Sequence, residues 1–212
     1  MYLPVQFEER RIEVLHDLIR AHPLGTLITL TAEGLDANHL PFELDAAPPP
    51  YGTLRGHVAR ANPLWQTFSR DLDVLVVFHG PEAYVSPAWY PTKKETGRVV
   101  PTWNYAVVHA YGPLRVIEDR SWLRALVERL TTRHEAGRPE PWRVSDAPAD
   151  FVERLLDAIV GLEIPIVRLV GKWKVSQNRP PHDRAGVVEG LRREGGAGAA
   201  PMADLVAGTQ PG

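Results

Sequence analysis

Two lysines with amide and hydroxyl neighbours stand close together in "GKWKVSQNR". In an extended chain, Lys172, Lys174, Ser176 and Asn178 point to one side, and Gln177 points to the other side. Two ammonium groups on one face of an otherwise apolar strand could bind an anion, with amide donors close by. The same pattern is typical of an edge strand that uses lysines to prevent aggregation. The residues alone leave both interpretations open.

A second basic group lies in "LRGHVARANP". Arg55 and His57 share one strand face, while Arg60 and Asn62 fall at a turn from strand to helix. Free N–H groups at a helix N-terminus together with an arginine are a common arrangement for binding phosphate. A solvated arginine and a structural helix cap would give the same pattern.

Aromatic side chains occur in the proline-rich stretch "YVSPAWYPTK" and in the alternating stretch "VPTWNYAVVHAYG". The first places Trp89 and Tyr90 in a rigid loop, where their rings could stack on a planar ligand or pack against a barrel end. In the second, large side chains alternate with small ones, which predicts a strand. We expect the large face, with His109, to be core. We expect the small face, from Asn104 to Ala110, to admit a flat ring or a partner subunit.

The histidines do not predict a metal site. Of the eight in the chain, the candidates are His39, His57, His79, His109 and His182, and no pair of these has the spacing of a recognisable metal motif. The sequence also contains no Walker loop, no GxGxxG and no nucleophile elbow. On these residues alone, the interpretation is a barrel protein that could bind a planar ligand bearing a phosphate.

Composition limits the class of protein. The chain has 212 residues, 44% of them hydrophobic, with a formal net charge of −2. The absence of cysteine excludes disulfides and thiol catalysis. We see no leader pattern and no apolar stretch near about 20 residues, so we expect a cytoplasmic protein that does not enter a membrane.

The elements that must position these residues are mostly strands. A helix is expected near residues 7–19, followed by strands at 24–31, 35–44, 52–59, 73–80, 100–117 and 162–178, with a further short strand and a long loop directly after residue 80. Helices are expected at 62–70, 122–130, 151–159 and 183–194, with caps at Asn62 and at Asp119 or Ser121, and a turn at Glu33-Gly34. The strands do not alternate regularly with helices, which favours a closed or partly closed antiparallel barrel.

Five segments together resemble the PaiB family of FMN-binding negative transcriptional regulators: "HLPF", "GHVARANP", "YVSPAWYP", "VPTWNYAVVHAYG" and "GKWKVSQNR". The resemblance covers roughly residues 1–191. It implies a mainly β fold with α additions, a split β-barrel of the FMN-binding, pyridoxamine-phosphate-oxidase-like type. It also implies a homodimer with FMN at the interface. We therefore expect one such domain over residues 1–193, with helices inserted at about 119–160, and a Gly/Ala-rich tail over 194–212.

The resemblance also implies candidate cofactor-binding residues. The flavin phosphate is expected near His57, Arg60 and Asn62, and the isoalloxazine ring near Ser86, Trp89, Trp103 and Asn104. Lys172, Lys174 and Gln177 are the remaining polar candidates. No motif of the family identifies a catalytic acid or base.

Several functions remain open at this stage. The family name implies a repressor of genes of the protease and sporulation type, yet no helix has the basic character of a DNA-recognition helix, so DNA binding rests on the resemblance alone. The alternatives are a small FMN-dependent oxidoreductase, a haem-binding or haem-degrading split barrel using His39, His57, His109 or His182, and a dimeric scaffold without flavin. Whether the protein is an enzyme is not decided by the sequence.

Overall fold

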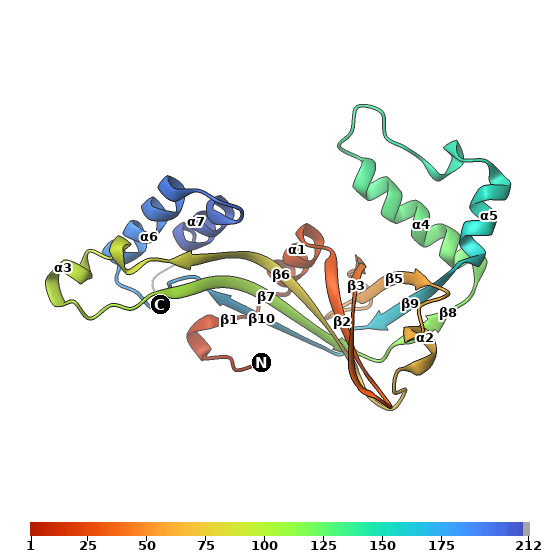
Figure 1. The fold of residues 1–212 in the computed structure, drawn as a ribbon, viewed down its shortest axis with the longest axis horizontal. Coiled ribbons are helices and arrows are strands. Elements are labelled where there is room, and N and C mark those ends of the chain that lie inside the picture. Colours follow the sequence, from red (N-terminus) through yellow and green to blue (C-terminus); the bar gives the residue numbers. More distant parts are fainter. Residues whose placement is uncertain (210–212) are drawn as a thin grey trace. The chain divides into compact units, whose positions relative to one another are not determined.

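The computed structural model describes residues 1–209, and these form two compact units (Figure 1). Unit 1 consists of Met1–Ala21, His79–Val108 and the chain from Val170 onward. Unit 2 consists of His22–Phe78 and His109–Leu169. Each unit is therefore assembled from segments that are far apart in the sequence.

The elements follow this division. Unit 2 holds β2 (Leu24–Thr31), β3 (Gly34–Pro41), β4 (Glu43–Asp45), β5 (Thr53–Ala59), α2 (Leu64–Thr67), β8 (Arg115–Ile117), α4 (Arg120–Glu135), a 3-10 turn (Val144–Asp146), α5 (Ala149–Asp157) and β9 (Ile159–Pro165). Unit 1 holds 3-10 turns (Val5–Phe7 and Pro87–Trp89), β1 (Glu8–Glu9), α1 (Ile12–Ala21), α3 (Thr92–Thr96), α6 (Pro181–Glu194) and α7 (Ala199–Ala207). Residues of both units occur in β6 (Val74–Val85), β7 (Thr102–Gly112) and β10 (Arg168–Lys174).

The strands form two sheets. One has the order β1-β10-β7-β6-β2-β3, and the other has the order β4-β5-β9-β8. The pairs β2–β3, β5–β9 and β8–β9 are antiparallel, and His57 lies opposite Gly161 in the β5–β9 pair. This architecture confirms a mainly β fold in which helices are additions.

Local sequence signals explain several of these elements. The predicted turn at Glu33-Gly34 joins β2 to β3, where the Glu33 N–H donates to the Thr31 hydroxyl at 3.1 Å. Gly34 has φ +120°, a conformation that L side chains rarely adopt. The predicted cap of α4 is also confirmed, because the Asp119 carboxylate accepts from the Trp122 N–H at 2.7 Å.

Two helices cover part of unit 2 as the apolar spacing predicted. Figure 1 shows α4 and α5 near each other. Leu123 of α4 packs in one buried cluster with Val144, Val152 and Leu156. The Trp122 ring lies over Gly161 of β9, where an added Cβ would come within 2.4 Å of the indole. The inserted helices are thus attached to the four-stranded sheet by close packing.

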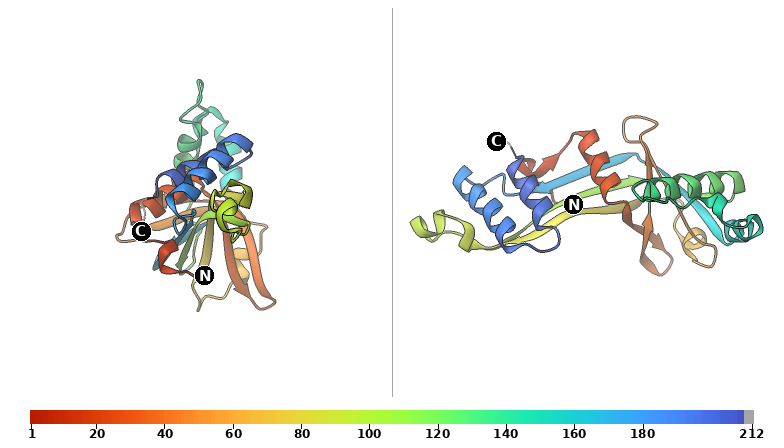
Figure 2. Two further views of the ribbon diagram at one scale, coloured as in Figure 1. Left: turned by 90° about the vertical axis from the view of Figure 1, so that its left-hand side faces the viewer. Right: turned by 90° about the horizontal axis from the view of Figure 1, so that it is seen from above.

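The C-terminal part contains a helix that the sequence analysis did not predict. Helix α7 lies beside α6 in unit 1 (Figure 2). Its Met202, Ala203 and Val206 are buried in a cluster that includes Val187 and Leu191 of α6. The Gly/Ala-rich composition does not predict this helix, because small residues bury little apolar area. The same small residues allow two helices to approach closely.

The expectation for the two faces of β7 was wrong. The small face is the buried one, since Asn104, Ala106, Val108 and Ala110 are each at most 1% exposed. On the other face, the Trp103 residue is 55% exposed and His109 is only partly buried. Small side chains let neighbouring backbone pack closely against this face: an added Cβ at Gly112 would lie 2.0 Å from the Pro165 carbonyl oxygen.

The limits of other predicted elements also differ. Strand β6 runs without a break to Val85, where the pattern predicts one strand that ends near residue 80 and a separate short strand after it. The expected single strand over 162–178 is two strands, β9 and β10, and β10 ends at Lys174. Beyond it, Ser176 has φ +63° and the Gln177 carboxamide bonds to the backbone of Trp173 and Val175, which turns the chain out of the sheet.

None of the helices among residues 1–209 has the length and apolar character needed to cross a membrane. The same residues contain no cluster of three or more metal-ligating His, Asp or Glu side chains.

Candidate functional site

Arg60, an expected phosphate ligand, binds other parts of unit 2. Its guanidinium donates to the Asp157 and Ile159 carbonyl oxygens at 2.9 and 3.3 Å, and to the Glu118 carboxylate at 2.7 Å. It also lies 5.7 Å from the centroid of the Trp65 ring. These contacts join the end of β5 to the start of β9, so the guanidinium already has a structural role. Its role toward phosphate stays a prediction.

Asn62 bonds to the backbone at the start of α2, but the N-cap position expected for it is occupied by Pro63. Its side-chain oxygen accepts from the Leu64 N–H at 2.9 Å, and its amide donates to Asn38 at 2.8 Å. Helix α2 is only four residues long, Leu64–Thr67. A single helical turn carries a small dipole, so this position offers little to a phosphate.

His57 lies against a cavity of about 340 Å³ in unit 2, lined also by Leu130, His134 and Trp142. Its Nδ1 is buried without a hydrogen-bond partner among the described residues. Burial lowers the pKa of the His57 imidazole, because the charged form would lose its hydration. His57 is therefore a neutral imidazole near neutral pH.

His57 predicts an acid dependence of stability. Its folded-state pKa lies below the ordinary value of 6.5 for a histidine, so between these two values the unfolded chain binds more protons than the folded chain. The free energy of unfolding should fall as pH decreases through this window. We expect His57→Gln to flatten that dependence, measured as urea midpoints at pH 7.0, 6.0 and 5.0. An unchanged pH profile in the variant would contradict the assignment.

The remaining candidates all lie in unit 1. Ser86 caps the 3-10 turn at Pro87–Trp89, where its hydroxyl accepts from the Ala88 N–H at 3.2 Å. Trp89 is 8% exposed, and its indole N–H donates to the Glu194 carboxylate at 2.8 Å. Both residues thus stabilise the packing of this turn. Trp89 also lines a cavity.

Trp103 and Asn104 lie on opposite faces of β7. The Trp103 ring is exposed and meets Tyr84 of β6 edge to face, with centroids 6.1 Å apart. The Asn104 amide is 1% exposed and donates to the Ser176 hydroxyl at 2.9 Å. Asn104 therefore fixes the turn after β10, while Trp103 is available to a ligand.

Lys172 and Lys174 lie on one face of β10, as predicted. The Lys172 Nζ donates to the Tyr2 carbonyl oxygen at 3.1 Å and lies 5.3 Å from the Tyr105 ring centroid. The Lys174 Nζ donates to the Trp103 carbonyl oxygen at 2.5 Å and to the Thr102 hydroxyl. Gln177 does not join them, because its carboxamide bonds to the local backbone.

Arg179 joins the two lysines, and we call Lys172, Lys174 and Arg179 the cationic cluster. Burial lowers the pKa of the Lys174 amine, and the charges of Lys172 and Arg179 lower it further. The Arg179 guanidinium lies 5.0 Å from the Tyr90 ring centroid. No Asp or Glu among residues 1–209 forms a salt bridge with any member of the cluster. The sequence pattern points to Tyr90 only as an aromatic residue of the proline-rich loop, and it does not point to Arg179, although Arg179 ends the motif that contains both lysines.

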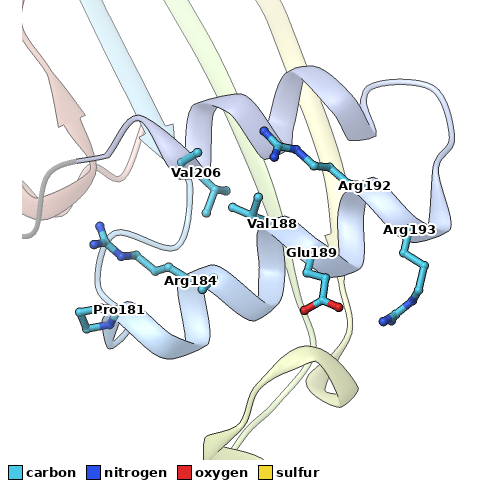
Figure 3. A pocket seen from close by; sticks show the side chains of 9 residues that line it. Pro181, Arg184, Val188, Glu189, Arg192, Arg193 and Val206 are labelled. Atoms are coloured by element: carbon cyan, nitrogen blue, oxygen red, sulfur yellow. The ribbon is translucent and has the colours of Figure 1, made fainter.

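Another basic part of unit 1, a groove of about 740 Å³ between α6 and α7, has a different character (Figure 3). Its Arg184 donates to the Thr209 carbonyl oxygen at 2.9 Å, and its Arg192 pairs with Asp204 at 3.1 Å. Arg193 lies 3.7 Å from Glu194. Arg192 and Arg193 thus have carboxylate partners, which no member of the cationic cluster has among the described residues, so the cationic cluster is the better candidate for an anion.

Comparison with known proteins gives a consistent family match. Residues 1–168 match the family model described as "Putative FMN-binding domain". The chain is 39% identical to "Uncharacterized protein AN0679" of Emericella nidulans, covering 92% of each chain. It is 34% identical to "Protease synthase and sporulation protein PAI 2" of Bacillus subtilis, covering 97% of this chain and 96% of that protein.

Among solved structures, the fold is similar to that of the flavocytochrome Anf3 from Azotobacter vinelandii. The TM-score is 0.59 at 14% identity, covering 79% of this chain and 69% of that chain. The fold class expected from the sequence, a mainly β split barrel with α additions, is confirmed.

Proposed function

Because the chain belongs to the PaiB family of proteins with an FMN-binding domain, we propose that it binds FMN and that the cationic cluster holds the phosphate. The observation that carries this proposal is that, within residues 1–209, three neighbouring cations have no carboxylate partner. Two of these cations lower the pKa of the Lys174 amine, so the cluster repels itself. A phosphate dianion would relieve this repulsion and accept charged hydrogen bonds.

The surroundings of the cluster suit a phosphate that carries an aromatic group. Lys172 lies between the rings of Tyr2 and Tyr105, at 5.8 and 5.3 Å from their centroids. Trp103, whose carbonyl oxygen accepts from Lys174, presents an exposed ring. Trp103 remains our candidate for contact with the isoalloxazine ring, which would supply the redox chemistry of a bound flavin.

Comparing FMN with riboflavin tests where the phosphate binds. Riboflavin has the same ring and lacks the phosphate, so we expect it to bind more weakly than FMN. Quenching of flavin fluorescence on titration with protein measures both affinities. Equal affinities would show that the protein does not hold the phosphate.

The affinity for FMN should also depend on pH in the alkaline range. The amine of Lys174 binds phosphate best when protonated, and its pKa is lowered from the ordinary lysine value of 10.5. Affinity should therefore fall as pH rises through this lowered pKa, before an ordinary lysine would titrate. Riboflavin affinity should not follow the same curve. Parallel pH curves for the two flavins would contradict this assignment.

We also propose the homodimer expected from the family. Strand β3 is the outermost strand of its sheet, and its Leu35 is 80% exposed. Leu24 on the neighbouring strand β2 is 63% exposed. Exposed apolar residues at a sheet edge favour association with another chain. Sedimentation equilibrium should give twice the chain mass, and a monomer at micromolar concentration would count against the proposal.

We further propose that the protein acts in the cytoplasm as a negative regulator of transcription. Its support is the Bacillus subtilis relative, whose name refers to protease synthesis and sporulation. A gel-shift assay with promoter fragments should show a complex that weakens with salt, as phosphate contacts require. If no salt-sensitive complex forms, the repressor role fails while FMN binding stands.

A further inference from the structure

Another cavity in unit 1 is lined by acidic residues, in contrast to the cationic cluster. Its volume is about 320 Å³, and Tyr84, Trp89 and Trp103 contribute aromatic rings to its lining. Glu82 and Glu194 contribute the carboxylates. We call this the aromatic–acidic cavity. From its lining we infer that it binds a small organic cation, such as a quaternary ammonium group.

The aromatic part of the cavity is open to a ligand. The Tyr84 and Trp103 residues are 48% and 55% exposed, although they are large apolar groups. Their rings meet edge to face at 71°, which fixes their relative orientation. The negative face of an aromatic ring attracts a cation, and cages of such rings recognise quaternary ammonium groups.

The two carboxylates give the cavity a negative charge. Glu82 has no salt bridge or side-chain hydrogen bond among the described residues, so its charge is uncompensated. The Glu194 carboxylate is held in place by the Trp89 indole at 2.8 Å, with Arg193 at 3.7 Å. The two carboxylates would repel an anion. A neutral apolar ligand would gain no electrostatic attraction to the charge of Glu82.

Close packing fixes the position of the backbone around the cavity. Gly198, at the start of α7, has φ +84°, and an added Cβ would lie 2.8 Å from the Glu82 carbonyl oxygen. Gly190 of α6 lies directly under the Trp89 ring, with 2.3 Å between an added Cβ and the indole. Two glycines thus bring α6 and α7 against the strand and turn that carry the acidic and aromatic groups. The cavity is preorganised, which lowers the cost of binding.

Choline and its neutral isostere 3,3-dimethyl-1-butanol provide a direct test, with the full chain and no flavin added. Calorimetric titration should show choline binding and the isostere binding at least about tenfold more weakly, because only choline is charged. Equal binding of both compounds, or no choline binding at tens of millimolar, would overturn the inference.

Two variants with a matched control locate the binding site. Glu82→Gln, which changes an exposed side chain, and Tyr84→Leu should each weaken choline binding several-fold. Glu95→Gln, which removes an exposed carboxylate of α3 outside the cavity, should leave it unchanged. Melting temperatures equal to that of the wild type establish that the variants fold. Choline affinity that is unchanged in both cavity variants would overturn the inference, whatever the outcome with FMN.

Discussion

Replacing Lys174 by alanine is expected to weaken FMN binding by about 1–3 kcal/mol, or roughly 5- to 150-fold, through loss of a charged hydrogen bond to the phosphate. Riboflavin binding should change little, because riboflavin has no phosphate. The Lys172→Ala/Lys174→Ala double variant should bind FMN more weakly still. Flavin fluorescence titration measures each affinity, and retained riboflavin binding shows that the variants are folded.

Two further variants make this experiment decisive. Lys93→Ala removes an exposed lysine of α3 that belongs to the same unit and has no salt bridge among the described residues, so it controls for net charge. Arg60→Ala tests the alternative position in unit 2 that the family resemblance implies. A loss of FMN affinity in Arg60→Ala without a loss in Lys174→Ala would place the phosphate in unit 2 and refute the cationic cluster.

Gly186→Ala is expected to destabilise the protein by about 1–3 kcal/mol, the usual cost of overpacking a well-packed core. Helix propensity predicts the opposite sign, because alanine in a helix interior is better than glycine by roughly 1 kcal/mol. Packing should prevail, since an added Cβ would lie 2.0 Å from the Trp89 carbonyl oxygen, a backbone atom. Backbone cannot move aside as a side chain can.

Thermal unfolding measures this effect, at about 2–4 °C of melting temperature for each kcal/mol in a chain of this size. Gly137→Ala is the matched control, because an added Cβ there meets no atom within 4 Å, and we expect a change within about 0.5 kcal/mol. A Gly186→Ala variant as stable as wild type would mean that α6 does not pack so closely on the turn at Pro87–Trp89.

Local signals in the sequence predicted much of the fold. The segment "LGTLITLT" forms β2, the turn at Glu33-Gly34 joins it to β3, and Asp119 caps α4. These features depend on residues within a few positions of one another. The faces of β7 were predicted wrongly, because an alternating pattern gives the period of a strand and leaves open which side meets the core. Helix α7 was not predicted, since its burial depends on contact with α6.

In the candidate site too, local features were predicted from the sequence, and features that depend on distant contacts were not. Lys172 and Lys174 stood out in the sequence because alternation places them on one face of a strand. Arg179 did not, because its contact with Tyr90 requires the left-handed turn at Ser176 to redirect the chain. The aromatic–acidic cavity combines strand β6, strand β7 and the end of α6. No one-dimensional pattern links residues so distant along the chain.

The buried small face of β7 limits which substitutions natural selection can accept. In related sequences, positions 106, 110 and 112 should remain glycine, alanine or serine, because a larger side chain would push apart neighbouring backbone. Positions 103 and 109 should vary more freely in size, since their side chains are less buried. Amino-acid substitutions along this strand are therefore expected to accumulate most slowly at the positions with the smallest side chains.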